Sequence, residues 1–80
     1  MPYKNITELP PNLQILLPKH AQEIFMEAFN HAWEEYKDPG KRRGSASREE
    51  TSRKVAWAAV KREYEKGEDE KWHRIQKVHG

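Results

Sequence analysis

The chain has 80 residues, 35% of them charged and none of them cysteine, which excludes a disulfide framework, a thiolate metal site and, at this size, a deep substrate cavity. Its net charge of +2 hides an asymmetry, because residues 1–40 carry a net −3 and residues 41–80 a net +5. We therefore expect one domain, residues 1–80 with a core of about 3–75, whose basic half either meets an acidic partner or is a solvated surface.

The N-terminal segment is rich in proline. Each proline removes an amide donor and restricts the residue before it, so we expect only one short helix before Pro18, with Pro11 in its first turn. Tyr3 precedes this helix in an extended arm. The first residues lack the apolar stretch of a signal peptide, and no run of about 18 apolar residues occurs anywhere. We expect a cytoplasmic protein that does not itself span a membrane.

A second helix is expected from Pro18 to about Lys37. Apolar side chains recur there at spacings of three and four, which is typical of an amphipathic helix. The sequence Asp38-Pro39-Gly40 should end it, because proline cannot continue a helix and glycine tolerates the reversed backbone. A basic, exposed loop, residues 39–46, is expected to follow.

The third helix has the clearest start signal. Ser47 and Glu50 have the spacing of a capping box, in which the serine hydroxyl accepts a hydrogen bond from the Glu50 amide and the glutamate reaches back. The pattern predicts a helix that runs to a stop at Gly67. Its segment from Val55 to Val60 is apolar almost all round, which is typical of a central, buried helix.

The C-terminal segment contains an acidic turn and then Lys71–Ile75, which fits either a short strand or an extended tail that packs back on the core. We expect Trp72 in this arm to pair with the arm that carries Tyr3. The predicted fold is therefore mainly α, a compact domain of about three helices with a small two-stranded sheet formed by the N-terminal and C-terminal arms.

Catalytic patterns are absent from the sequence. No serine or threonine has a histidine and an acid in nucleophile order, and glycine is too sparse for a phosphate cradle. Glu27, His31 and Glu35 share a helix face and could hold a cation weakly, but such a series is more often a solvated face. We expect no enzyme, no cofactor and no metal site.

The best candidate for a partner-binding site is basic. Six cations and only two acids fall within fourteen residues, a balance that suits a polyanion. No aromatic side chain is interleaved in the loop, so binding to nucleic acid would use the phosphate backbone. The alternative is a loop that only keeps the surface solvated. The candidate residues are Lys41, Arg42, Arg43, Arg48, Arg53 and Lys54.

Several blocks of the sequence, in order, resemble the ChaB family: Met1-Pro2-Tyr3, Leu9-Pro10, Leu17-Pro18 with Ala21–Phe25, Ala28–Asn30 with Ala32-Trp33, Ala46–Glu50, and Lys54–Lys61. The resemblance extends from Met1 to Trp72. It implies a fold of three helices plus a small sheet, and a non-enzymatic regulator of a cation/proton antiporter for sodium or calcium. Viral relatives in the family are regarded as DNA-binding, so the resemblance also leaves nucleic acid as an alternative partner.

One feature departs from the family. Some relatives carry an acidic loop between the second and third helices, whereas this chain has Lys41-Arg42-Arg43-Gly44, which would repel divalent cations. The departure weakens a metal role that the resemblance would otherwise imply. It favours an anionic partner, which is nucleic acid, anionic lipid or an acidic cytoplasmic loop of a transporter such as the antiporter.

Overall fold

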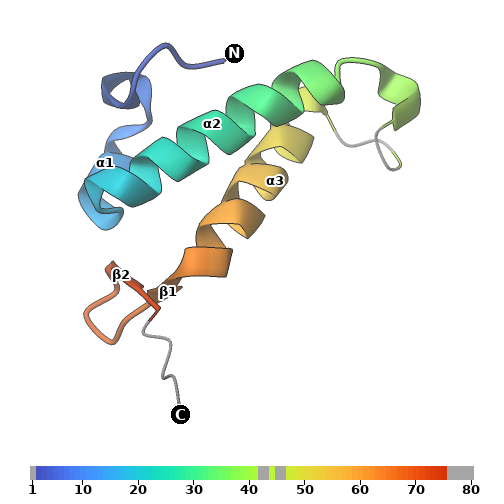
Figure 1. Cartoon of the computed structure of the whole chain (residues 1–80). Helices are drawn as coiled ribbons and strands as arrows, with labels where there is room; N and C mark the ends of the chain where they lie inside the picture. The colour runs from blue at the N-terminus through green and yellow to red at the C-terminus, as the bar shows by residue number, and fades with distance from the viewer. Residues whose placement is uncertain (1, 42–43, 45–46, 76–80) are drawn as a thin grey trace.

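The computed structural model describes residues 2–41, 44 and 47–75 (Figure 1). The fold is mainly α with a small two-stranded antiparallel sheet, which confirms the predicted fold class. In chain order the elements are the 3-10 helix η1 (Ile6–Glu8), helices α1 (Pro11–Leu16) and α2 (Lys19–Glu35), the 3-10 helix η2 (Pro39–Lys41), helix α3 (Arg48–Glu63), and strands β1 (Tyr64–Lys66) and β2 (Trp72–Arg74).

Helices α2 and α3 run in opposite directions and pack against each other, and α1 lies at the N-terminal end of α2 (Figure 1). Small side chains meet where the two long helices pack, since Ala32 of α2 and Ala56 of α3 are both fully buried. Phe25 and Phe29 of α2 are the largest fully buried side chains. The molecule is only 19 Å thick, about two helix diameters, so a single apolar layer holds it together.

The helix starts follow the local signals in the sequence. Pro11 occupies the first turn of α1, and Pro18 directly precedes α2. Ser47 caps α3, because its Oγ accepts a hydrogen bond from the Glu50 amide at 3.0 Å. Glu49 and Glu50 add negative charge to the positive end of the helix dipole. Three local signals therefore set where the three helices begin.

The expected end of the third helix at Gly67 is wrong. Helix α3 ends at Glu63, and Tyr64 already has the extended backbone of β1, with φ −130° and ψ 151°. The Tyr64 ring is buried at 5% exposure, and its hydroxyl lies 3.0 Å from Nδ1 of His20 on α2. The chain leaves the helix early because this aromatic side chain packs against the start of α2.

The segment Val55–Val60 is also less buried than its composition predicts. Ala56 and Val60 are fully buried, but Ala58 is exposed and Val55 and Ala59 are only half-buried. The reason is that α3 packs against α2 along one side only. Its other side carries small apolar side chains at the surface.

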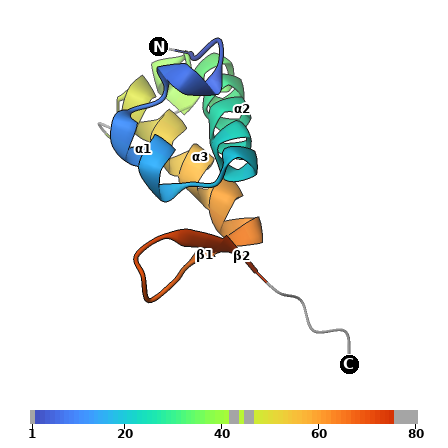
Figure 2. The ribbon, with the colours of Figure 1, turned by 90° about the vertical axis from the view of Figure 1, so that its left-hand side faces the viewer.

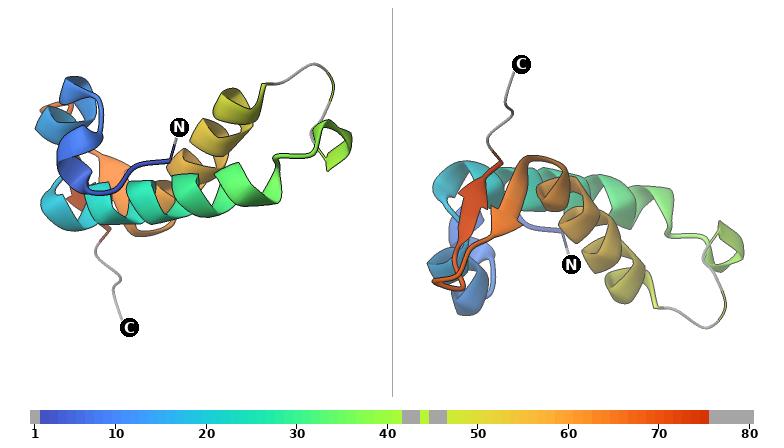
Figure 3. Two further views of the ribbon diagram at one scale, coloured as in Figure 1. Left: turned by 90° about the horizontal axis from the view of Figure 1, so that it is seen from above. Right: turned by 90° about the horizontal axis from the view of Figure 1, so that it is seen from below.

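The predicted pairing of the N-terminal and C-terminal arms is wrong. The two strands are neighbours in the chain, β1 and β2, paired in the register Tyr64 with Arg74 and Lys66 with Trp72. The N-terminal arm instead runs along α2 (Figure 3). There the Asn30 side chain forms hydrogen bonds with both backbone polar groups of Tyr3. The Tyr3 amide donates to Oδ1 of Asn30 at 2.7 Å, and Nδ2 of Asn30 donates to the Tyr3 carbonyl at 2.7 Å.

The β1–β2 hairpin lies beneath the helices, at the end of α3 (Figure 2). Its turn is tight at Gly67, where a Cβ atom would come within 2.8 Å of His73 and 2.9 Å of Asp69. Trp72 joins the hairpin to the core, because its ring centroid lies 5.2 Å from that of Trp57 on α3. The strand predicted around Trp72 is confirmed, with a different partner.

The N-terminal arm gives a direct test of this architecture. We expect Asn30→Ala to lower the free energy of unfolding by about 1–2 kcal/mol, because both backbone groups of Tyr3 lose their partner in a partly buried place. Urea unfolding measures the loss, and amide exchange should show that the Tyr3 amide loses protection. Glu34→Ala, an exposed change on the same helix, is the control. Equal unfolding curves for both variants would contradict the assigned contact.

Candidate functional site

The structure describes four of the six basic candidates, and these four differ in what they contact. Arg42 and Arg43 lie outside the residues that the structure describes. Arg48 has a role within the fold, because its Nε donates to the Trp33 carbonyl at 2.7 Å and its guanidinium lies 4.1 Å from the centre of the Trp33 ring. These contacts hold the start of α3 against the end of α2. Nucleic acid binding would therefore have to compete for Arg48.

Arg53 is available to a partner. It forms an exposed ion pair with Glu49, one turn earlier on α3, at 3.2 Å, and the two side chains are 56% and 61% exposed. A pair in this setting contributes little to stability, so a stronger anionic partner can replace the glutamate. Lys54 beside it is exposed, as is Lys41 in η2.

Arg53 also lies at the edge of a hollow, which we call the aromatic pocket. The N-terminal arm, the start of α1, and helices α2 and α3 surround it, and its volume is about 320 Å³. That is the lower end of the range for small-ligand sites. The lining residues are Tyr3, Pro10, Asn12, Leu13, Phe25, Phe29, Glu49, Arg53 and Trp57.

The rings in this pocket are held in place by the core. The centroid of Phe25 is 5.3 Å from that of Trp57 in an edge-to-face arrangement, and Tyr3 lies 5.0 Å from Phe29. Phe25 and Phe29 are buried, while Tyr3 and Trp57 are partly exposed to the hollow. The accessible aromatic surface of the pocket therefore comes from Tyr3 and Trp57, which lie over the buried rings of Phe25 and Phe29.

The polar edge of the aromatic pocket affects the Tyr3 hydroxyl. Burial raises the pKa of Tyr3 above its usual 10.0, the Glu49 carboxylate raises this pKa further, and Arg53 opposes the change. A phenol, a carboxylate and a guanidinium thus share one rim. Tyr3 keeps its proton near neutral pH and remains a hydrogen-bond donor there.

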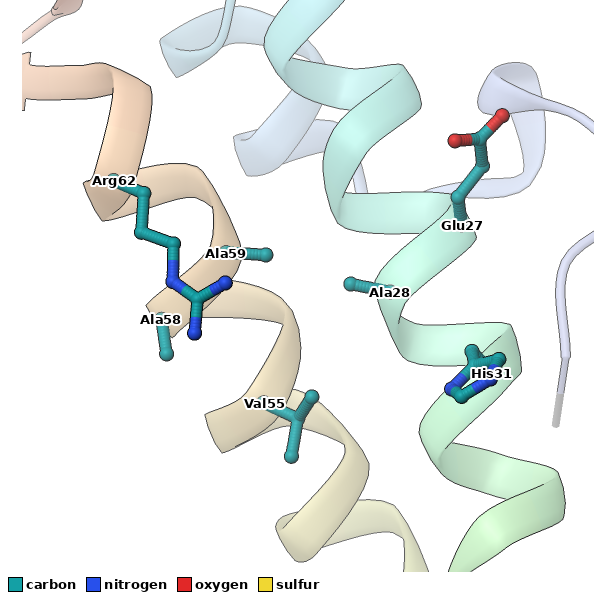
Figure 4. Close-up of a pocket in the computed structure, with 7 residues that line it drawn as sticks. All are labelled: Glu27, Ala28, His31, Val55, Ala58, Ala59 and Arg62. Carbon is teal, nitrogen blue, oxygen red and sulfur yellow. The ribbon is translucent and has the colours of Figure 1, made fainter.

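A second hollow, which we call the α2–α3 groove, opens between the two long helices (Figure 4). It is shallow and holds about 570 Å³. Small apolar side chains form its floor, and charged or polar ones stand on its two walls. The lining residues are Glu27, Ala28 and His31 from α2, and Val55, Ala58, Ala59 and Arg62 from α3. It shares no residue with the aromatic pocket.

The side chains of Glu27, His31 and Glu35, which the sequence suggested for weak cation binding, do not converge on one point. His31 Nδ1 lies 3.8 Å from Glu35, with both side chains exposed, and Glu27 stands on the wall of the groove. Within residues 2–41, 44 and 47–75, no three acidic or histidine side chains converge as metal ligands. Across the same residues, no helix is long and apolar enough to cross a bilayer.

The acidic turn holds an ion pair of its own. Asp69 accepts from His73 Nε2 at 3.0 Å and from the Lys71 amide at 3.1 Å, and these bonds, the first above all, lower the pKa of Asp69 from its usual 3.8. Because the folded pKa is the lower one, the pairing stabilises the hairpin above about pH 4 and is lost as the pH falls through the folded pKa.

This pairing predicts a measurable titration. We expect His73→Val, which keeps strand propensity but removes the donor, to raise the pKa of the Asp69 carboxyl toward 3.8. Carboxyl-carbon NMR across the acid range measures it. The exposed Glu34 carboxyl on α2, outside the hairpin, is the internal control. An Asp69 titration that the substitution leaves in place would show that the hydrogen bond is not formed in solution.

The sequence of this chain matches a known protein family. The sequence model of the ChaB family matches residues 9–74, which is most of the chain. The chain belongs to the ChaB family. The resemblance stated from the sequence is therefore confirmed.

Relatives in the ChaB family are similar over nearly their whole length. The chain is 61% identical over 74 residues to a protein of Escherichia coli (strain K12), covering 92% of this chain and 97% of that protein. A Shigella flexneri protein gives the same values. The names of both proteins describe them as ChaB, a suggested regulator of cation transport.

A solved ChaB structure has the same fold. The NMR solution structure of a ChaB protein, also named as a suggested cation transport regulator, matches with a TM-score of 0.78 at 59% identity. The match covers 94% of this chain and all of that one. This chain and that solved structure therefore share the same overall fold.

Sequence reasoning named Arg53 as a candidate but did not predict the aromatic pocket beside it. The available signal was the spacing of Glu49, Arg53 and Trp57 at intervals of four, which places an acid, a cation and an aromatic ring on one side of a helix. The other half of the pocket comes from Tyr3 and Phe25, far away in the sequence. Only the folded chain brings these residues together.

Proposed function

We propose that this protein is a non-enzymatic regulator of a cation/proton antiporter for sodium or calcium, which it contacts from the cytoplasmic side. The support is its membership of the ChaB family together with 61% identity to relatives that are named as suggested regulators of cation transport. Regulation here requires binding and no chemistry on a substrate. The structural question is then which surface makes the contact.

The aromatic pocket with Arg53 on its rim is the observation that carries this assignment. The partly exposed rings of Tyr3 and Trp57 offer a contact surface for one apolar or aromatic side chain, the kind of anchor that dominates binding energy in protein interfaces. The Arg53 guanidinium can exchange its exposed ion pair with Glu49 for a bidentate ion pair with a carboxylate next to that anchor. We propose an acidic cytoplasmic segment of the antiporter, with an apolar residue beside its acid, as the ligand.

Local charge favours protein contact over capture of the transported ion. Arg53 repels cations at this rim and its ion pair offsets the charge of Glu49, the carboxylate that lines the pocket, while the exposed Lys54 adds positive charge next to Arg53 on α3. The same charges attract an acidic segment and speed its association, an effect that salt weakens. Ion flux would then change because the antiporter is bound, and not because ions are withheld from it.

A pull-down of the detergent-solubilised antiporter tests the proposal. We expect Arg53→Glu to weaken binding by at least about tenfold, which corresponds to about 1.4 kcal/mol, because the substituted side chain repels the carboxylate that Arg53 attracts. Lys61→Glu is the matched control, since it makes the same charge change at an exposed position of α3 outside both hollows. Equal retention of both variants would rule out the aromatic pocket as the contact site, and no retention of the parent protein would rule out direct contact.

A further inference from the structure

The α2–α3 groove is the second surface of the molecule with an unusual combination of features. Its floor is apolar and made of small side chains, Ala28, Ala58 and Ala59, and Ala58 is exposed. Its walls have opposite charge: exposed Glu27 stands on α2 and exposed Arg62 on α3. Figure 4 shows these two residues on opposite helices at a similar level, toward one end of the groove, with the Glu27 carboxylate directed away from α3 and with His31 and Val55 toward the other end.

We propose that the groove is a self-association face, which pairs with the same groove of a second copy of this chain. Symmetric dimers use one patch on both subunits, so that patch must carry its own complement. The groove does so through its two walls. A two-fold axis along the groove places α2 of the second copy over α3 of the first, and Glu27 of each copy then meets Arg62 of the other.

The positions of Glu27 and Arg62 along the length of the groove support this geometry. Rotation about an axis along the groove exchanges its two walls but keeps positions along its length. Glu27 and Arg62 lie at the same end, so both ion pairs form at once. Because α2 and α3 run in opposite directions, each helix also meets an oppositely directed helix of the second copy. The helix dipoles at the interface are then antiparallel.

The floor sets how close the two copies come and how tightly they bind. Alanine side chains allow close approach of helices, while the apolar area they supply is modest compared with the roughly 800 Å² per partner of a standard interface. We therefore expect a dissociation constant on the order of 10⁻⁵–10⁻⁴ M. The aromatic pocket uses other residues of both helices and stays open in such a dimer.

Sedimentation equilibrium of the full chain, with variants that reverse the charge on either wall of the groove, tests the proposal. From about 10 μM to about 1 mM protein, a range chosen to bracket the expected dissociation constant, the parent should shift from monomer to dimer. Glu27→Arg places Arg opposite Arg in its own dimer, and Arg62→Glu places Glu opposite Glu, so each variant alone should stay monomeric. An equimolar mixture of the two variants should dimerise again, because both cross-pairs then join opposite charges.

Three results of this experiment would overturn the proposal of self-association, provided that each variant is folded. Both positions are exposed, and circular dichroism and thermal melting of each variant check that its fold is kept. A parent protein that is monomeric throughout the range would overturn the proposal. So would dimerisation that neither single variant weakens, or variants that fail to recover when mixed. If Glu27→Arg reduced capture of the antiporter by a chain that never self-associates, the occupant of the groove would be the antiporter and the second-copy assignment would be wrong.

Discussion

Replacing Phe25 by alanine is expected to lower the free energy of unfolding by about 3–5 kcal/mol, the largest effect of any single change proposed for this chain. The Phe25 ring is 2% exposed and lies between Phe29, at a centroid distance of 6.3 Å, and Trp57, at 5.3 Å. Its removal leaves a cavity in the single apolar layer that joins α2 to α3. No second layer can collapse into that space.

The consequence for the folded population is severe. A domain of this length has a total stability of roughly 4–12 kcal/mol, so the Phe25→Ala chain should melt far below the parent or be partly unfolded at room temperature. Thermal and urea unfolding followed by circular dichroism measure the loss. Ile15→Ala is the control, because Ile15 is 72% exposed and should change stability by less than about 0.5 kcal/mol. Similar losses in both variants would mean that the core is wrongly assigned.

Ala56→Leu is expected to lower the free energy of unfolding by about 2–3 kcal/mol through overpacking. Ala56 is fully buried on the side of α3 that faces α2, so a larger side chain has to push the two helices apart. Urea unfolding in dilute solution gives the value. Ala58→Leu is the matched control, since it makes the same change two residues later at an exposed position. If both leucines were tolerated equally, the helices would not pack on the Ala56 side.

The sequence predicted the helices well because their starts depend on short-range chemistry. Pro11 and Pro18 can only occupy or precede a first turn, and the Ser47 hydroxyl needs only an amide three residues away. The pairing of strands could not be predicted in the same way. Trp72 pairs with β1, while the side chain of Asn30, 27 residues from Tyr3, holds the backbone of the N-terminal arm along α2.

The candidate site was predicted only in part, for a related reason. Composition identified Arg53 as a cation on a basic stretch but gave no sign that Arg48 would be used to join α3 to Trp33. The aromatic pocket depends on residues of four separate segments, among them Tyr3 and Trp57, which no local pattern connects. Charge can be read along a chain, whereas a hollow exists only after the chain has folded.

We propose above that the protein changes cation transport by binding an antiporter through the aromatic pocket. The most direct test is cation/proton exchange by the purified antiporter in sealed vesicles, with this protein added on the side that bears the cytoplasmic segments. We expect the parent protein and Lys61→Glu to change the exchange rate in the same direction and to a similar extent, and Arg53→Glu to have little effect. An exchange rate that saturating parent protein leaves unchanged would contradict the claim.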